Sequence, residues 1–183
     1  MRRRAVLLTA ALALAGCTNT PAPASPAGPE APASPAGPAA PSPSAAKRST
    51  PKSLSFKGTT LEGAAFDAAS LAGKPAVLWF WAPWCATCAS EAQSIADIHD
   101  EYGDRLGILG IAGMGTKKAM NEFVSDFELS AVPHLNDPGG KIWQRFGIAQ
   151  QSWYVLIDPD GKIIHTGYLD DLQLTEKVRA LTA

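Results

Sequence analysis

The chain has little net charge and few of the side chains that bind metals. Its 183 residues carry a formal net charge of −1, so the composition gives no electrostatic case for nucleic-acid binding. It has only three cysteines and three histidines. A structural zinc site needs four ligands, usually from a second CxxC pair or a paired histidine motif. We therefore expect no nucleic-acid partner and no metal site.

The N-terminus lacks an apolar run long enough to span a bilayer stably. The run over Ala5–Ala15 is short and follows three arginines, as in the signal peptide of an exported protein. LAGC at residues 14–17 resembles a bacterial lipobox, which implies cleavage before Cys17 and a lipid on its sulfur. The alternative is an ordinary secretory signal with a chance cysteine. We expect residues 1–16 to be a lipoprotein signal peptide, and Cys17 to anchor the protein to the cell membrane on its extracytoplasmic face.

The next segment lacks the apolar residues needed for a core. Residues 18–52 hold ten of the fifteen prolines, and PASPAGPEA at 23–31 returns as PASPAGPAA at 32–40. Such a composition cannot bury enough surface to offset the entropy of ordering. We therefore expect residues 17–52 to be a lipidated cysteine followed by a disordered Pro/Ala/Ser linker, which could reach up to roughly 100 Å from the membrane.

From about residue 53 the hydrophobic pattern becomes that of a globular α/β domain. Two continuous apolar runs, at 76–81 and 106–112, are typical of strands buried on both faces. Helical spacing of apolar residues predicts four helices, over residues 85–102, 116–129, 141–146 and 172–181. Turn residues predict two hairpins, over 54–63 and 153–166. Residues 53–183 should therefore form a mixed central sheet covered by helices, with an N-terminal hairpin extension.

The cysteine pair of this domain lies at the junction of a predicted strand and a predicted helix. Unpaired amides and the positive end of the helix dipole favour a thiolate at Cys85, and Cys88 follows one turn later to resolve a mixed disulfide. A purely structural disulfide would close too small a loop to stabilise the fold much. Copper binding by the thiolates is a further alternative, since soft ligands suit Cu(I). The pattern favours dithiol–disulfide exchange in an exported, disulfide-permissive compartment.

The sequence around the pair resembles a known family. WAPWCATC at 81–88 is similar to the active-site signature of the thioredoxin fold, and LAGKP at 71–75 with Glu91 resembles its TlpA/ResA/DsbE-like branch. GIAG at 110–113 and PHLND at 133–137 resemble the actinobacterial DsbE/DsbF-like lipoprotein oxidoreductases. The resemblance implies a three-layer thioredoxin-like fold, and catalytic roles for Cys85, Cys88 and Glu91, the last tuning the pair. It implies no cofactor beyond the redox-active Cys85–Cys88 disulfide.

Two positions depart from the family pattern. Trp79 stands where many thioredoxins have a buried aspartate, and Ser152 stands where the fold has a cis-proline facing the cysteines. A cis bond before a non-proline residue costs about 2.5–4 kcal/mol, so either Gln151–Ser152 is cis in a constrained site or the loop is trans. We expect Trp84, Gln151 and Ser152 to contact the substrate. The serine could also let a metal approach the sulfurs.

Taken together, these features predict a lipid-anchored, extracytoplasmic thiol–disulfide oxidoreductase that exchanges through a mixed disulfide at Cys85. Oxidation of exported proteins is favoured over reduction of apocytochrome c. The expected partners are exported protein thiols and disulfides, and a membrane redox protein that resets the pair. The alternative is a copper-binding metallochaperone or a non-catalytic redox module on the same fold. His134, placed in the loop after Pro133, is expected to be a turn histidine with its hydrogen bonds satisfied; the alternative is that it approaches the sulfurs.

Overall fold

The computed structural model describes residues 49–183, and the predictions for residues 1–48, Cys17 among them, lie outside that range. The central sheet of this part has five strands in the order β5-β4-β3-β6-β7. In chain order these strands are β3 (Ala76–Trp81), β4 (Gly107–Ala112), β5 (His134–Asn136), β6 (Trp153–Ile157) and β7 (Ile163–Tyr168). The strand β3 lies at the centre, parallel to β4 and antiparallel to β6. The predicted mixed sheet is confirmed.

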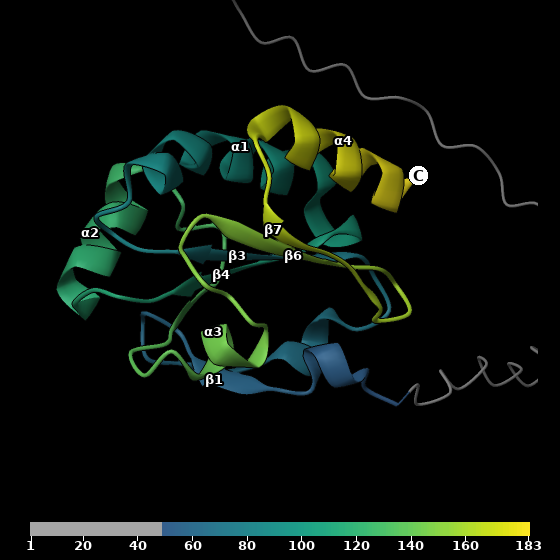
Figure 1. The fold of residues 1–183 in the computed structure, drawn as a ribbon, viewed down its shortest axis with the longest axis horizontal. Coiled ribbons are helices and arrows are strands. Elements are labelled where there is room, and N and C mark those ends of the chain that lie inside the picture. The colour runs from purple at the N-terminus through teal and green to yellow at the C-terminus, as the bar shows by residue number, and fades with distance from the viewer. Residues whose placement is uncertain (1–48) are drawn as a thin grey trace, which may run out of the picture. The chain divides into compact units, whose positions relative to one another are not determined.

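Helices of very different size cover the two faces of this sheet (Figure 1). The helices α1 (Ala86–Tyr102), α2 (Lys117–Asp126) and α4 (Asp171–Thr182) pack on one face. The short helix α3 (Lys141–Arg145) packs on the other, together with the N-terminal segment. This is the three-layer arrangement expected from the sequence.

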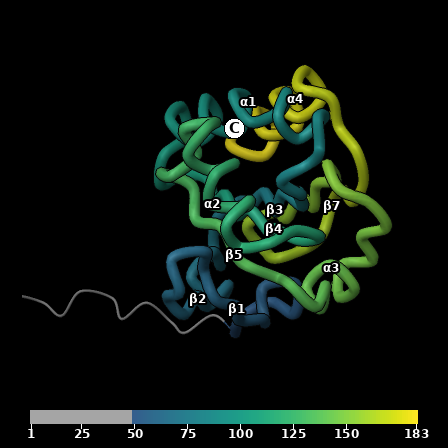
Figure 2. Tube along the Cα trace, turned by 90° about the vertical axis from the view of Figure 1, so that its left-hand side faces the viewer, coloured from purple at the N-terminus to yellow at the C-terminus, as the bar shows by residue number. Residues whose placement is uncertain are grey.

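Residues 52–71, which begin the described domain, form a two-stranded sheet and two short 3-10 turns. The strands are β1 (Lys57–Thr59) and β2 (Ala65–Asp67), paired antiparallel, and the 3-10 turns are η1 (Lys52–Leu54) and η2 (Ala68–Leu71). Figure 2 shows β1 and β2 beside the β5 side of the main sheet. The expected hairpin exists, but its strands lie at 57–59 and 65–67, so the predicted range of 54–63 was wrong. Gly63, with φ +96°, lies in the turn itself, not at the end of a strand.

The alternation of side chains along β3 decides which residues meet the large helices. Trp79 and Trp81 point toward α1 and α2, whereas Leu78 and Phe80 point toward α3. Successive residues of a strand face opposite sides of the sheet, so the two tryptophans share one face. This face carries the cysteine pair.

One sheet element is absent from the sequence prediction. Residues His134–Asn136, which we assigned to a loop, form the strand β5 and pair parallel with β4. Three residues between Pro133 and the turn at 137–140 give too short a run for periodicity to reveal. The strand brings His134 into the core.

The helix boundaries lie within a few residues of the predicted ones. Thr116 caps α2 by accepting a hydrogen bond from the Ala119 amide, and α4 starts with a capping box between Asp170 and Gln173. A short 3-10 turn, η3 (Gly103–Arg105), follows α1. No helix within residues 49–183 combines the length and apolar character that crossing a membrane requires.

Candidate active site

The cysteine pair is a disulfide at the point where β3 gives way to α1. Cys85 is the N-cap residue of α1, in extended conformation, and its Sγ accepts a hydrogen bond from the Cys88 amide at 3.0 Å. Cys85 is 6% exposed and Cys88 is 0% exposed. An incoming sulfur can therefore reach only Cys85. The amide at its Sγ and the start of the helix would stabilise a thiolate there once the disulfide opens.

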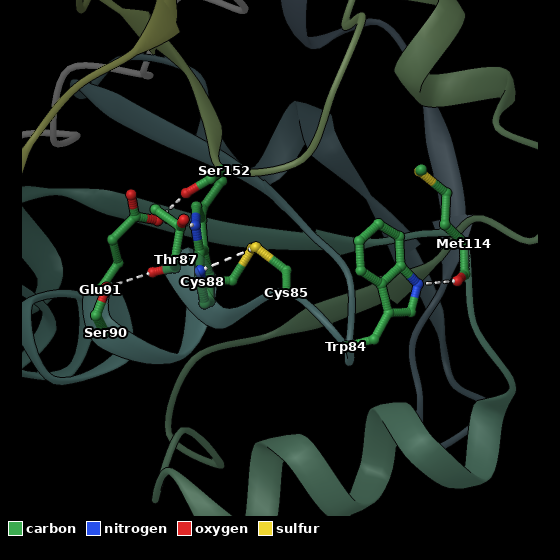
Figure 3. Close-up of a disulfide and its surroundings, with 9 residues drawn as sticks. Trp84, Cys85, Thr87, Cys88, Ser90, Glu91, Met114 and Ser152 are labelled. Carbon is green, nitrogen blue, oxygen red and sulfur yellow. Dashed lines mark hydrogen bonds between the residues drawn. A yellow bond between two sulfur atoms is a disulfide. The ribbon is translucent and has the colours of Figure 1, made fainter.

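An apolar rim lies beside Cys85. Trp84 is 58% exposed, and its indole N–H donates a hydrogen bond to the Met114 carbonyl at 2.7 Å. Figure 3 shows Trp84 and Met114 on the Cys85 side of the disulfide, away from Glu91. Met114 also lines a hollow of about 310 Å³, whose other walls include Trp143, Ile148 and Ala149. Because the hydrogen bond fixes this exposed tryptophan, the rim is a preformed surface next to the reactive sulfur.

Glu91 is buried on the other side of the disulfide. It lies on α1 one turn after Cys88 and is 3% exposed. Its Oε2 accepts hydrogen bonds from the Trp79 indole at 3.2 Å and from the Ser152 hydroxyl at 2.5 Å, and its Oε1 has no hydrogen-bond partner within residues 49–183. Burial raises the pKa of Glu91 above its usual value, and the bonds from Ser152 and Trp79 counter part of that rise.

Tyr154 of β6 is a second buried polar side chain near Glu91. Within residues 49–183 its buried hydroxyl has no hydrogen-bond partner, yet it lies close enough to Glu91 to lower the pKa of that carboxyl. Burial, followed by the charge of Glu91, raises the pKa of Tyr154 far above its usual range. The phenol therefore stays protonated at physiological pH.

Ser152, at the position where the family resemblance implies a cis-proline, follows a trans peptide bond and has a left-handed backbone conformation. None of the peptide bonds in the described residues is cis, and Ser152 has φ +67°. Its amide donates to the Phe80 carbonyl at 2.7 Å, and its side chain is 3% exposed. The trans alternative left open by the sequence is the one adopted. Both polar groups of Ser152 bond inward, to β3 and to Glu91, whereas its neighbour Gln151 is half-buried.

His134 lies on the same face of the sheet but away from solvent. The Trp81 indole donates to its Nδ1 at 3.2 Å, so Nδ1 must be unprotonated and Nε2 must carry the hydrogen that faces the Leu129 carbonyl at 3.3 Å. Burial lowers the pKa of His134 to about 4. Our prediction of a turn histidine was wrong, because β5 carries the side chain into the core.

The structure thus brings Cys85, Cys88, Glu91 and Ser152 together and places Trp84 beside them (Figure 3). Sequence reasoning missed the hydrogen bonds of the β3 tryptophans and the place of Tyr154 beside Glu91. A signal was present, since two tryptophans two residues apart on a buried strand must face the same side and each N–H needs an acceptor. Within the described residues, no three His, Cys, Asp or Glu side chains gather into a metal-binding group.

A redox-active disulfide at a strand–helix junction of this three-layer fold defines a thioredoxin-fold thiol–disulfide oxidoreductase. Residues 51–166 match the AhpC/TSA family, and the chain belongs to that family.

Two groups of relatives share about 70% of the chain. It is 40% identical over 134 residues to the soluble secreted antigen MPT53 of Mycobacterium tuberculosis, covering 71% of this chain and 76% of that protein. It is 30% identical over 130 residues to the thiol-disulfide oxidoreductase ResA of Bacillus cereus, covering 69% of this chain and 75% of that protein.

Solved structures agree with this assignment. The structure of MTB DsbF matches with 39% identity and a TM-score of 0.68, covering 73% of this chain and 99% of that one. A secreted Mycobacterium tuberculosis disulfide oxidoreductase homologous to E. coli DsbE matches with 40% identity and a TM-score of 0.65, covering 71% and 98%. The thioredoxin-like fold and the family resemblance predicted from the sequence are confirmed.

Proposed function

We propose that the protein is a lipid-anchored, extracytoplasmic oxidoreductase that oxidises the thiols of exported proteins through a mixed disulfide at Cys85. The observation that carries the proposal is the unequal accessibility of the two sulfurs. Cys85 reaches the surface at the start of α1, and Cys88 is fully buried behind it. Attack by a client is therefore directed to one sulfur.

The proposed reaction begins when a client thiolate attacks Cys85 Sγ. A bond forms between the client sulfur and Cys85, the Cys85–Cys88 bond breaks, and its electron pair leaves on Cys88. A second client thiolate then attacks the client sulfur of the mixed disulfide and displaces the Cys85 thiolate. The client leaves oxidised, and the enzyme is left as a dithiol that a membrane redox partner reoxidises.

The leaving Cys88 needs a proton, and burial keeps water from supplying it. Glu91 lies one turn away on the same helix, and its pKa is raised by burial, so it retains a proton to higher pH than an exposed glutamate does. We assign Glu91 as the group that gives this proton to Cys88 and takes it back on reoxidation. Its role in tuning the pair, expected from the family resemblance, is proposed on this ground.

The client docks against the surface around Cys85. Exposed Trp84 supplies a fixed aromatic contact, and half-buried Gln151 lies in the loop that precedes β6. Apolar and aromatic rims of this kind bind extended polypeptide without demanding one sequence. The hollow next to Met114 gives a client side chain a place to enter.

The location and the anchor rest on different observations. The relatives include a soluble secreted antigen and a secreted disulfide oxidoreductase, which supports work outside the cytoplasm. Attachment through Cys17 rests on the lipobox-like sequence LAGC at 14–17. The copper-binding alternative loses its motivation, because the Ser152 hydroxyl bonds to Glu91 instead of facing the sulfurs.

The proposed activity is tested by thiol–disulfide exchange with a reduced, unfolded secretory protein. Cys85→Ser should abolish exchange. Cys88→Ser, which has no disulfide of its own, should trap a mixed disulfide when the client is supplied oxidised, because the Cys85 thiolate attacks a client disulfide and one client thiolate leaves. Unchanged turnover in Cys85→Ser would refute the mechanism. An equilibrium reduction potential near −120 to −200 mV supports an oxidase, and one below about −250 mV supports a reductase. Loss of membrane retention in Cys17→Ser tests the anchor.

A further inference from the structure

We infer that Ser152 is a positioning residue for the cysteine pair, because its hydroxyl holds the Glu91 carboxylate in place one turn beyond Cys88. The inference rests on the proposed function, since it assigns a task to Ser152 in the proton transfer described for Glu91. It concerns the position where the family resemblance leads one to expect a proline, which has no hydrogen to donate.

Two hydrogen bonds fix Ser152 itself. Its amide bonds to the Phe80 carbonyl of β3, and its hydroxyl bonds to Glu91 Oε2 across 61 residues of sequence. The left-handed backbone, φ +67°, turns the side chain inward toward α1. Proline could not adopt this φ, and it has no amide hydrogen to donate to Phe80. The serine thus makes possible a trans loop that is tied to both β3 and α1.

The two donors at Oε2 leave the other oxygen of Glu91 for chemistry. The Trp79 indole can only donate, so Oε2 must accept from it, and the Ser152 hydroxyl completes the pair. A proton on Glu91 then sits on Oε1, which has no partner within residues 49–183. Losing the serine hydroxyl would free the carboxyl to rotate and remove a donor that stabilises its charged form.

Few other ionisable groups face this carboxyl. Tyr154 comes from β6 and Asp171 from the start of α4, and the charge of Asp171 opposes ionisation of Glu91. Tyr168 of β7 contributes to the raised pKa of Tyr154. Cys88 lies on α1, the helix that also carries Glu91. No cation in the described residues contributes to holding the Glu91 charge. Neutral groups therefore hold this charge: the donors Ser152 and Trp79, and the nearby phenol of Tyr154.

The direct test is a carbon-13 carboxyl NMR titration of Glu91 in the oxidised, intact protein. Ser152→Ala removes only the hydroxyl, and Ser152→Gly removes it while relieving the left-handed backbone. Both variants should raise the titration midpoint of Glu91 by about one pH unit, a tenfold gain in proton affinity. Ser90→Ala is the matched control, because Ser90 is the exposed neighbour of Glu91 and, among residues 49–183, its hydroxyl bonds to the Thr87 carbonyl and not to Glu91. It should leave the midpoint unchanged.

A second readout ties the effect to the disulfide. The pH profile for reduction of Cys85–Cys88 by dithiothreitol should move upward in Ser152→Ala by the same amount, and this shift should vanish when Glu91→Gln is also present. An unmoved midpoint in both serine variants overturns the inference, as does a profile shift that survives in the Glu91→Gln background. The carboxyl titration needs no client, so absence of client exchange with a normal titration would refute the proposed function alone.

Discussion

Two buried ionisable side chains, Glu91 and His134, lie on the same face of the sheet, and each is held by a tryptophan of β3. They differ in whether every polar atom of the side chain has a hydrogen-bond partner. Both nitrogens of His134 have partners, Trp81 and the Leu129 carbonyl, whereas Glu91 Oε1 has none in the described part of the chain. His134 is also further from the disulfide in sequence and sits on β5, whereas Glu91 shares a helix with Cys88.

The comparison shows how similar local contacts serve different ends. A buried group whose hydrogen bonds are all made is a fixed part of the core, and protonating it breaks that arrangement. A buried group with one free oxygen can gain or lose a proton without giving up its other contacts. The Trp81–His134 pair therefore supports the site, and the Trp79–Glu91 pair acts in it.

The largest effect should come from breaking the histidine pair with Gly110→Ala. Gly110 is in register with Trp79 of β3 and His134 of β5, and a Cβ there would lie 2.7 Å from His134 Cε1 and 2.9 Å from Trp81 Nε1. We expect a loss of about 3 kcal/mol or more in unfolding free energy, measured by denaturant titration. Gly139→Ala controls for loss of a glycine, because this exposed turn residue has no positive φ and the nearest atom to an added Cβ is Lys141 Cγ at 3.9 Å. Equal, small losses in both variants would show that the rings over Gly110 move aside easily.

Acid should weaken the protein through His134. Because burial lowers its folded-state pKa to about 4 from 6.5, the unfolded chain binds the proton first. Stability is full above pH 6.5 and falls as the pH drops toward 4, by up to about 3 kcal/mol. The His134→Gln variant should lack this slope, as measured by unfolding at several pH values. A slope identical to the wild type would assign the acid sensitivity to other groups.

Removing the carboxyl of the Trp79–Glu91 pair should slow catalysis more than it changes folding stability. Glu91→Gln should slow exchange by about 10²-fold or more, the usual contribution of a positioned proton donor. Because the folded-state pKa of Glu91 is raised, its ionisation costs stability as the pH rises through that pKa. The variant should therefore gain stability over the wild type near pH 8, and this gain should disappear below pH 4.5. Stopped-flow exchange and denaturant titration measure the two effects, and a slower enzyme that is also less stable at pH 8 would contradict the assignment.

The smallest effects should come from the same substitution made in each pair. Trp79→Phe removes the weaker donor to Glu91 and should raise the titration midpoint of the Glu91 carboxyl. It should change the loss of stability at low pH very little. Trp81→Phe frees His134 Nδ1 to bind a proton and should reduce the acid slope, at a cost of about 1 kcal/mol at neutral pH. NMR titration and unfolding curves separate them. If both variants changed both properties, the two pairs would be one coupled network.

Much of the fold could be predicted because its signals are local. The strand at 76–81 is a continuous apolar run, α1 follows directly from it, and Asp158–Gly161 marks the hairpin between β6 and β7. The strand β5 could not be predicted, because three residues carry no period. The trans state of Gln151–Ser152 could not be predicted either, since it depends on hydrogen bonds to Phe80 and Glu91.

The sequence by itself determined the chemistry: a CxxC pair entering a helix from a buried strand is specified by neighbouring residues, and so is the helix end that favours a Cys85 thiolate. Only the tertiary structure decided which groups surround that pair. The bonds of Trp79, Trp81 and Ser152 join residues 12, 53 and 61 positions apart. Contacts of that range form when strands and helices pack, so folding, and no local motif, determines which buried group is free to move a proton.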